Sequence, residues 1–247
     1  MRVVANVIAI TSLFLAGSVQ AMDTSSHDSF DQVLQAHVNE GKVDYPAIKE
    51  DKQFQDYLTY LAETNPERFA TDNEKLAFWI NAYNALAIKG ITDGLSPSGF
   101  FSRITYFKST NYKLAGRDIN LYDLERDIII PFGDPRIHFA IVCASASCPN
   151  LISEAYMADE LEQQMEDNAK RFINNDFKNQ FDPEKKIARV SKIFDWFTED
   201  FKNHSGSVQK FIAGYIEDSS LAKLLAEDSF RIEYLKYDWS LNGTPIK

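Results

Sequence analysis

The segment "KLAFWINAYNALAIKG", residues 75–90, constrains the fold more than any other part of the chain, because it is apolar on almost every face. The sequence directly before it, Thr71-Asp72-Asn73-Glu74, is a capping box, in which the Thr and Glu side chains satisfy free N–H groups at the start of a helix. A helix that is apolar all round is buried in a protein core. We therefore expect a buried central helix over residues 72–89.

Two amides interrupt this apolar helix. Asn81 and Asn84 are its only strongly polar residues between Leu76 and Ile88. They are three residues apart, so their side chains are neighbours on the helix surface. A buried amide without a partner costs about 1–3 kcal/mol. The two residues are therefore expected either to join the helix to neighbouring segments or to face a binding site.

The rest of the chain predicts further helices and short strands. Helices are predicted after the capping residue Asn120, over residues 153–175 and after Ser191. Strands are predicted within residues 103–121, with a turn at 115–117, and at 136–143, 187–190 and 230–242. This order predicts an α+β fold. We expect a single, mostly helical domain with a small, largely antiparallel sheet.

The first 21 residues have the pattern of a secretory signal peptide. Arg2 supplies a positive charge, and Val7–Leu15 is an apolar run too short to cross a bilayer. Val19-Gln20-Ala21 is a small-x-small cleavage site. We expect cleavage after Ala21 and a periplasmic or secreted protein with one domain over residues 22–247. The alternative is that the segment is retained as a membrane anchor.

The charge of the chain excludes two classes of partner. The chain has 36 Asp and Glu residues against 26 Lys and Arg residues, a formal net charge of −10. Such a protein repels nucleic acid and anionic membrane surfaces. No later run approaches about 18 apolar residues, so we expect no membrane span after signal cleavage.

Five strings resemble, in the same order, the family catalogued as domain of unknown function 547, which occurs in bacteria and plants. They are "GKVDYPAI", "KLAFWINAYNAL", "DPRIHFAIVCASASCPNL", "WFTEDF" and "YDWSLN". The resemblance extends from about Phe30 to Asn242 and is to an exported bacterial member. It implies a fold and a set of shared residues, but no established reaction.

The shared residues come from both halves of the chain. They are Asn81, Tyr83, Asn84, His138, Cys143, Cys148, Pro149, Trp196, Asp200, Tyr237, Asp238, Trp239 and Asn242. One position departs from the family pattern. Many members have His where this chain has Arg126. If that His takes part in a reaction in relatives, this protein has lost it or uses another base.

Both cysteines lie in "RIHFAIVCASASCPNL", residues 136–151, and their first interpretation is a disulfide. They are the only thiols of the chain, and an exported protein meets an oxidising compartment. Bridging requires Cα atoms about 4.4–6.8 Å apart, whereas five extended residues span about 17 Å. The chain must therefore turn sharply between Cys143 and Cys148, and the small residues "ASAS" allow this.

The second interpretation makes Cys143 a nucleophile. A strand-to-helix turn can expose such a thiol and direct backbone N–H groups at an oxyanion. His138 is one candidate base, although strand alternation places it on the opposite face from Cys143. His204 is the other candidate, because Asp200 lies four residues earlier on the same helix and could orient its ring.

Two function classes follow from these patterns. The first is a ligand- or partner-binding domain with a Cys143–Cys148 clip, in which Tyr83, Asn81 and Asn84 contact a small molecule or peptide. The alternative is a cysteine-dependent hydrolase or transferase acting on a peptide or amide bond. In that case Asn81 or Asn84 could supply an amide to an oxyanion or to the base. The sequence does not indicate an oligomeric state.

No cofactor or metal is expected. Two cysteines and a nearby His could ligate zinc, but their spacing matches no strong zinc pattern. The chain has no phosphate-binding glycine loop, dinucleotide fingerprint, Gly-x-Ser-x-Gly or His-Glu-x-x-His motif. Nucleotide, flavin and serine-hydrolase functions therefore have no support in the sequence.

Overall fold

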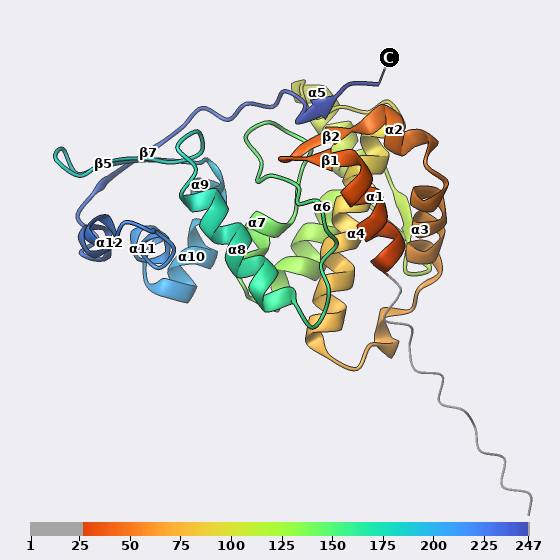
Figure 1. The fold of residues 1–247 in the computed structure, drawn as a ribbon, viewed down its shortest axis with the longest axis horizontal. Helices are drawn as coiled ribbons and strands as arrows, with labels where there is room; N and C mark the ends of the chain where they lie inside the picture. The colour runs from red at the N-terminus through yellow and green to blue at the C-terminus, as the bar shows by residue number, and fades with distance from the viewer. Residues whose placement is uncertain (1–26, 247) are drawn as a thin grey trace, which may run out of the picture.

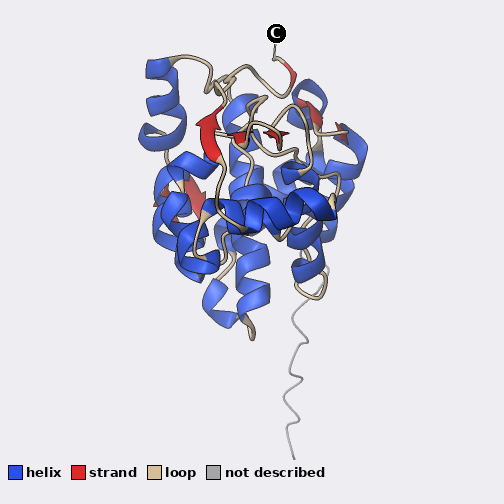
Figure 2. Ribbon diagram, turned by 90° about the vertical axis from the view of Figure 1, so that its left-hand side faces the viewer, coloured by secondary structure: helices blue, strands red, loops and turns tan. Residues whose placement is uncertain are grey.

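The structure is a computed structural model that describes residues 27–246 (Figure 1). The expected signal peptide therefore lies outside the described residues. Short strands lie among many helices, as Figure 2 shows, and the predicted α+β fold is confirmed. No helix in the described range has both the length and the apolar character needed to cross a membrane.

The helices are spread along the whole described chain. The α-helices are α1 Asp28–His37, α2 Tyr45–Glu50, α3 Lys52–Glu63, α4 Asp72–Thr92, α5 Phe100–Ile104, α6 Leu121–Asp123, α7 Ile137–Ala140, α8 Leu161–Ile173, α9 Ile193–Trp196, α10 Thr198–Ser205, α11 Val208–Ala213 and α12 Ser219–Ala226. The 3₁₀ turns are η2 Pro66–Arg68 and η5 Ile130–Phe132, and the π-helical segments are η3 Thr105–Ser109 and η4 Leu124–Ile129.

The strands form three small sheets instead of the single sheet expected. The strands are β1 Val38–Asn39, β2 Lys42–Asp44, β3 Tyr112–Leu114, β4 Arg117–Ile119, β5 Gln180–Asp182, β6 Ile187–Val190, β7 Arg231–Tyr234 and β8 Gly243–Thr244. Their orders are β1-β2-β8, β3-β4 and β5-β6-β7. The β2–β8 and β6–β7 pairs are parallel, and the other pairs are antiparallel.

Helix α4 lies at the centre of the molecule, as predicted (Figure 1). Its capping box is present, because Glu74 N donates to Thr71 Oγ1 over 3.1 Å and Thr71 N donates to Glu74 Oε2 over 2.9 Å. Segments α2, α3, α6 and η4 contact the helix. Nearly all of its residues from Leu76 to Thr92 are buried. The capping box thus starts a helix whose stability comes from burial on every face.

Two hydrophobic cores meet at the short helix α7. Ile137 and Ala140 belong to the core around α4. Phe139 belongs to a second core, in which its ring packs near Phe172 of α8 and Phe201 of α10. His138 lies between these residues in the sequence and is itself buried. A polar side chain is therefore placed where the two cores join.

The expected strand over residues 136–143 is wrong. Ile137–Ala140 form helix α7, and the chain becomes extended only from Ile141. An apolar run of this length fits a buried strand or a buried helical turn equally well, so its pattern could not distinguish them. The turn is anchored by Asp134, whose carboxylate accepts a hydrogen bond from Arg136 N over 2.8 Å.

The extent of two other predicted elements is corrected. Residues 103–109 are helical instead of β, because this conformation lets Tyr106 pack on α4 and donate to Ala87 O over 2.7 Å. The long helix predicted from residue 153 starts only at Leu161. The backbone before it is bound by side chains instead: Gln164 Nε2 donates to Ala155 O over 2.8 Å.

Candidate functional site

The two cysteines lie at the ends of a tight loop. Cys143 Sγ and Cys148 Sγ are 2.8 Å apart, and the backbone N–H of Cys143 points at Cys148 Sγ over 2.9 Å. Ala144 has a φ of 59°, in the left-handed region that allows a sharp turn. The expected proximity of the two sulfurs is confirmed. They are not bonded in this structure, so the disulfide stays a prediction.

The C-terminal segment, residues 235–242, holds this loop in place. In Figure 1 the segment runs from β7 across the molecule towards β2. Ala146 N donates to Ser240 O over 2.7 Å. On the loop's other side, the Lys178 ammonium donates to the carbonyl oxygens of Cys148, over 2.9 Å, and of Ala146. The loop is therefore fixed by contacts from outside it.

Helix α4 fixes the chain before the loop through Asn84. Its amide donates to Ala140 O over 3.0 Å and accepts from Val142 N over 2.8 Å. Asn81 makes the same pair of bonds with the backbone of Tyr156, over 2.8 and 2.9 Å. Each amide both donates and accepts within the fold, and neither residue lines the cavity described next. Of the two expectations for these residues, the structure shows the one that joins the helix to its neighbours.

A cavity of about 420 Å³ lies beside the cysteine loop. Both cysteines, His138 and Glu125 contribute to its lining. Most of the remaining wall is aromatic, formed by Tyr83, Phe100, Phe107, Tyr122, Trp196, Phe197, Tyr237 and Trp239. These residues come from α4, α5, η3, α6, α9, the residue between α9 and α10, and the C-terminal segment. The cavity therefore exists only in the folded protein, and Tyr83 is the one predicted binding residue that lines it.

Three cations lie against the aromatic rings of this cavity. The distances from cation to ring centroid are 4.6 Å for Arg103 over Trp239, 4.0 Å for Lys108 over Tyr122 and 4.9 Å for Arg126 over Phe197. Within residues 27–246, none of the three makes an ion pair with a carboxylate. A cation over a ring face is attracted by the ring's electron density. One Arg103 nitrogen donates to the carbonyl oxygens of Pro97 and Ser98, both over 3.4 Å. The positive charges of the three groups are nevertheless not neutralised by a carboxylate within 4 Å among the described residues.

The Cys143 sulfur is surrounded by groups that favour its thiolate. Ser145 Oγ is 3.2 Å away and Tyr237 OH is 3.3 Å away. The Ser145 and Tyr237 hydroxyls are also hydrogen-bonded to each other, over 3.1 Å, so the sulfur and both hydroxyls form one cluster. Burial raises the pKa of Cys143, but hydrogen bonds from Cys148, Ser145 and Tyr237 outweigh it and lower the pKa below that of an ordinary thiol.

The second thiol of the pair is shifted in the opposite direction. Burial, together with the neighbouring Cys143, raises the pKa of Cys148 well above its ordinary value. Cys148 is only 5% exposed, whereas Cys143 is partly exposed. When one proton leaves the pair, the negative charge therefore resides on Cys143, the cysteine with more access to the cavity.

Glu125 is a candidate acid or base that the sequence did not single out. It lies in the π-helical segment η4 and lines the same cavity as Cys143. Burial raises its pKa to about 7, although Arg126 and a hydrogen bond from Tyr83 oppose this shift. Both the acid and the carboxylate are therefore present near neutral pH. π-Helical turns are frequent at functional sites, but no sequence pattern indicated one here.

The structure gives Asp200 a different partner from the one expected. Its carboxylate is 2.8 Å from Nε2 of His138, and His204 instead bonds its neighbour Ser205 over 2.9 Å. His204 is exposed and does not line the cavity. Burial lowers the pKa of His138, which is therefore neutral near pH 7 and donates its Nε2 proton to Asp200. Cys143, His204 and Asp200 do not form a catalytic triad here.

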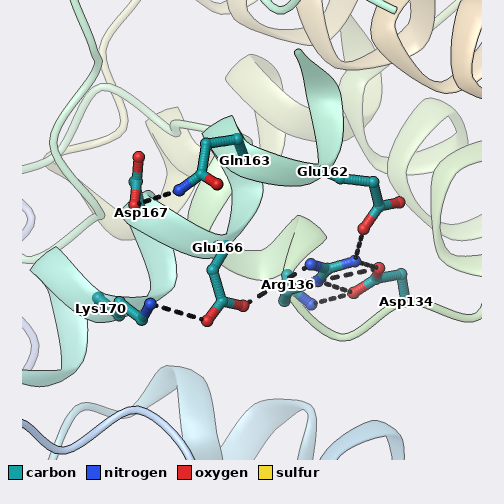
Figure 3. A network of polar contacts seen from close by, with 7 residues as sticks. All are labelled: Asp134, Arg136, Glu162, Gln163, Glu166, Asp167 and Lys170. Carbon is teal, nitrogen blue, oxygen red and sulfur yellow. Dashed lines mark hydrogen bonds and ion pairs between the residues drawn. The ribbon is translucent and has the colours of Figure 1, made fainter. Parts of the chain in front are cut away.

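Arg136 fixes the turn from which His138 projects. Figure 3 shows its guanidinium between Asp134 and helix α8. One nitrogen donates to Asp134 and, over 2.7 Å, to Glu162, and a second nitrogen is 3.8 Å from Glu166. Ion pairs that share a largely buried guanidinium hold their geometry better than isolated surface pairs. This network sets the position of α7 against α8.

Two other features bear on what the site can hold. Among the residues that the structure describes, no group of three or more His, Cys, Asp or Glu side chains is placed to hold a metal ion. A second cavity, of about 410 Å³, lies against α8 and is lined by polar side chains such as Asn168, Arg171 and Lys178. It contains neither cysteine nor His138.

The fold and site together define an α+β domain whose aromatic cavity is walled on one side by a pair of cysteines. A family model described as "Protein of unknown function, DUF547" matches residues 67–173, from η2 to the end of α8. The matched segment contains Tyr83, Glu125 and both cysteines. This match supports the family resemblance seen in the sequence. No curated protein and no solved structure matches the chain.

Proposed function

We propose that this protein binds a small apolar molecule carrying a negatively charged group, and that the cavity beside Cys143 is its binding site. The observation that supports this most strongly is the combination of aromatic walls with three cations that have no carboxylate partner among the described residues. The cavity volume, about 420 Å³, falls within the range of about 300–1,000 Å³ typical of small-molecule sites.

The charges around the cavity support an anionic ligand despite the acidic character of the chain. The whole chain has a net charge of −10. The cavity lining instead contains Arg103, Lys108 and Arg126, opposed by Glu125, whose pKa of about 7 leaves it partly neutral. A carboxylate or sulfonate beside an arginine forms strong, charge-assisted hydrogen bonds. The apolar part of the ligand is expected to supply most of the affinity, at about 25 cal/mol per Å² buried.

A pair of fluorescent dyes tests both parts of this proposal. 8-Anilinonaphthalene-1-sulfonate is an apolar anion, and N-phenyl-1-naphthylamine is its neutral counterpart without the sulfonate. We expect the folded protein to bind both dyes and to bind the anionic one more tightly. Absence of binding by either dye, in protein shown to be folded by near-UV circular dichroism, would rule out an open apolar site.

Charge variants identify the site. Arg103→Gln and Arg126→Gln should each weaken binding of the anionic dye by about three- to tenfold, the effect of losing a partly screened charge pair. Binding of the neutral dye should change little. Lys223→Gln is the matched control, because Lys223 is exposed on α12 and does not line the cavity. Equal losses for all three variants would indicate a general charge effect and would contradict a site at this cavity.

A cysteine-dependent hydrolase or transferase is the second candidate, and one observation favours it. Cys143 and Glu125 line the same cavity, and a group with a pKa near the working pH is suited to general acid–base catalysis. In this proposal Cys143 attacks an acyl carbonyl, and Glu125 protonates the leaving amine. Water, or an acceptor nucleophile in a transferase, then cleaves the Cys143 thioester and regenerates the thiol. Hydrolysis of fluorogenic acyl amides that is abolished in Cys143→Ala and reduced in Glu125→Gln would establish it. The binding proposal requires no such turnover.

We further propose that the mature protein acts in the periplasm or outside the cell. The support is the signal-peptide pattern of the first 21 residues. The cysteine pair is compatible with this location, because an oxidising compartment favours a disulfide between adjacent thiols.

A further inference from the structure

We infer that Cys143 and Cys148 form a dithiol–disulfide redox couple that exchanges electrons with an organic disulfide bound in the cavity. This activity goes beyond the proposed binding function. It uses the same cavity but does not require the ligand to be an anion. Three features of the pair support it: unequal access, groups that stabilise one thiolate, and a loop that holds the sulfurs within reach of each other.

The two sulfurs differ in their access to a molecule in the cavity. Both cysteines contribute to the lining, but Cys148 is 5% exposed and Cys143 is more exposed. A substrate disulfide would therefore meet Cys143 first. Attack in thiol–disulfide exchange depends on access as well as on thiolate content. The position of Cys143 suits the attacking thiol, and the position of Cys148 suits the thiol that completes the exchange.

The surroundings of Cys143 favour the thiolate, which is the attacking species. The Cys148 sulfur, the Ser145 hydroxyl and the Tyr237 hydroxyl lie 2.8, 3.2 and 3.3 Å from the Cys143 sulfur. The pKa of Cys143 is lowered by these hydrogen bonds, and that of Cys148 is raised by burial. The more accessible thiol of the pair is thus also the more easily ionised one.

The loop is held so that an internal disulfide can form without a large rearrangement. The sulfurs are 2.8 Å apart, and a disulfide requires about 2.05 Å. Lys178 bonds the carbonyl oxygen of Cys148, and Ser240 bonds the backbone of Ala146. Because these contacts involve the backbone, rotation of the two cysteine side chains can close the remaining gap.

The exchange balances in two steps. The Cys143 thiolate attacks one sulfur of the bound disulfide R–S–S–R, forms a Cys143–S–S–R mixed disulfide and releases one R–S⁻. The Cys148 thiol passes its proton to the first R–S⁻ and attacks the Cys143 sulfur, which forms the Cys143–Cys148 disulfide and releases the second R–S⁻. The protein gives up two electrons, and the substrate disulfide accepts them. An external dithiol returns the electrons and completes the cycle.

The aromatic walls define the class of disulfide expected. Trp196, Tyr237 and Trp239 are packed together, with ring centroids 4.5–5.8 Å apart, next to the cysteine pair. An aryl or other apolar group attached to the disulfide can bury its surface against them. We therefore expect small aryl disulfides to react faster than small hydrophilic disulfides such as oxidised glutathione.

The test uses the full-length purified protein, reduced with dithiothreitol and separated from it by gel filtration. The probe is 5,5′-dithiobis(2-nitrobenzoate), an aryl disulfide that releases a coloured thiolate. The folded wild type should release two equivalents of coloured thiolate per protein chain. It should end with an internal disulfide and show no adduct in its mass spectrum. Cys148→Ser should release coloured thiolate from one cysteine and retain a thionitrobenzoate adduct on Cys143. Cys143→Ser should react at least about tenfold more slowly, because its remaining thiol is buried.

Two further measurements keep the inference testable if a variant folds poorly. In the folded, reduced wild type, brief treatment with iodoacetamide should label Cys143 before Cys148, as read by peptide mass spectrometry. The neutral aryl disulfide 2,2′-dithiodipyridine should oxidise the wild type too. Suppose that the protein binds the anionic dye more tightly than the neutral dye but reacts with neither disulfide. The binding proposal would then stand, and the redox inference would fail.

The inference is overturned by any of three results. The first is a wild type whose thiols react only after denaturation. The second is an internal disulfide that dithiothreitol cannot reduce without unfolding, which would make the pair purely structural. The third is a Cys148→Ser variant that reacts no differently from Cys143→Ser, because the structure assigns the two thiols distinct roles.

Discussion

Asp200 holds His138 through a hydrogen bond of 2.8 Å between its carboxylate and Nε2 of the ring. The imidazole also stacks on Phe197, with ring centroids 3.8 Å apart. These contacts connect α10 to the turn that leads to the cysteine loop. The pKa of Asp200 is lowered by this hydrogen bond, which indicates that the contact favours the ionised carboxylate.

Asp200→Ala should therefore destabilise the protein. The variant leaves the buried Nε2–H group of His138 without its acceptor, which costs about 1–3 kcal/mol. Asp200→Asn should cost less, because its amide oxygen can still accept. Urea denaturation measures both effects. Asp195→Ala is the control, since Asp195 pairs with Lys192 at the surface of α9 and such pairs contribute at most about 1 kcal/mol. Equal midpoints for Asp200→Ala and wild type would contradict the account.

Asn84→Leu should destabilise the protein by more than about 1 kcal/mol, although it adds apolar surface. The substitution strands a buried carbonyl of Ala140 and a buried N–H of Val142. The chemically matched control is Asn203→Leu, because Asn203 is exposed on α10 and should tolerate the change within about 0.5 kcal/mol. Chemical denaturation compares the two, and an Asn84→Leu midpoint equal to that of the control would show that the bridging bonds contribute nothing.

Glu125 should make stability depend on pH in a definite direction. Its folded pKa, about 7, is raised from 4.5 by burial, so the folded protein holds the proton more tightly than the unfolded chain. Its contribution is fully present below pH 4.5 and is lost as pH rises through 7. The loss is up to about 3 kcal/mol. Glu125→Gln keeps the neutral form at all pH values. Relative to wild type, its free energy of unfolding should therefore increase between pH 4.5 and 8, and a constant difference would contradict the raised pKa.

Truncation after Lys236 should give insoluble or unfolded protein. The deletion removes the backbone partner of Ala146, the Trp239 ring beneath Arg103 and strand β8, which pairs with β2. Circular dichroism and a thermal melt of any soluble fraction test this. A soluble truncation that unfolds cooperatively would show that the cysteine loop does not depend on the C-terminal segment.

Export should leave a mature chain that starts at Met22. The prediction comes from the signal-peptide pattern and the cleavage site that ends at Ala21. Intact-mass spectrometry of protein recovered from a periplasmic extract measures the N-terminus directly. Recovery of a chain that still begins at Met1 would contradict cleavage.

The parts of the fold that could be predicted are those fixed by local chemistry. The capping box at Thr71 and the apolar helix after it follow from a few adjacent residues. In the C-terminal segment the predicted alternation of exposure holds, since Leu235, Tyr237 and Trp239 are less exposed than the residues between them. Of the strand predicted over 230–242, however, only Arg231–Tyr234 forms, as β7. The apolar run before Cys143 was misread, because periodicity cannot separate a short buried helix from a buried strand.

The candidate site was predicted only in part, because its chemistry depends on contacts between distant segments. The loop with Cys143 was identified from the sequence. Helical spacing correctly placed Asp200 and His204 close along α10, yet tertiary packing directs Asp200 to His138 instead. Glu125 and the cations over the aromatic rings have no distinguishing pattern around them. Arg126, which was noted only as a departure from the family, proves to line the cavity.

The most direct test of the central claim is a crystal structure of the protein with 8-anilinonaphthalene-1-sulfonate bound. The account predicts the naphthalene ring in the cavity beside Cys143, against Trp196 or Trp239, with the sulfonate beside Arg103 or Arg126. Dye bound only in the polar cavity near Arg171, or an aromatic cavity that stays empty at saturating dye, would contradict the assignment of this cavity as the ligand site.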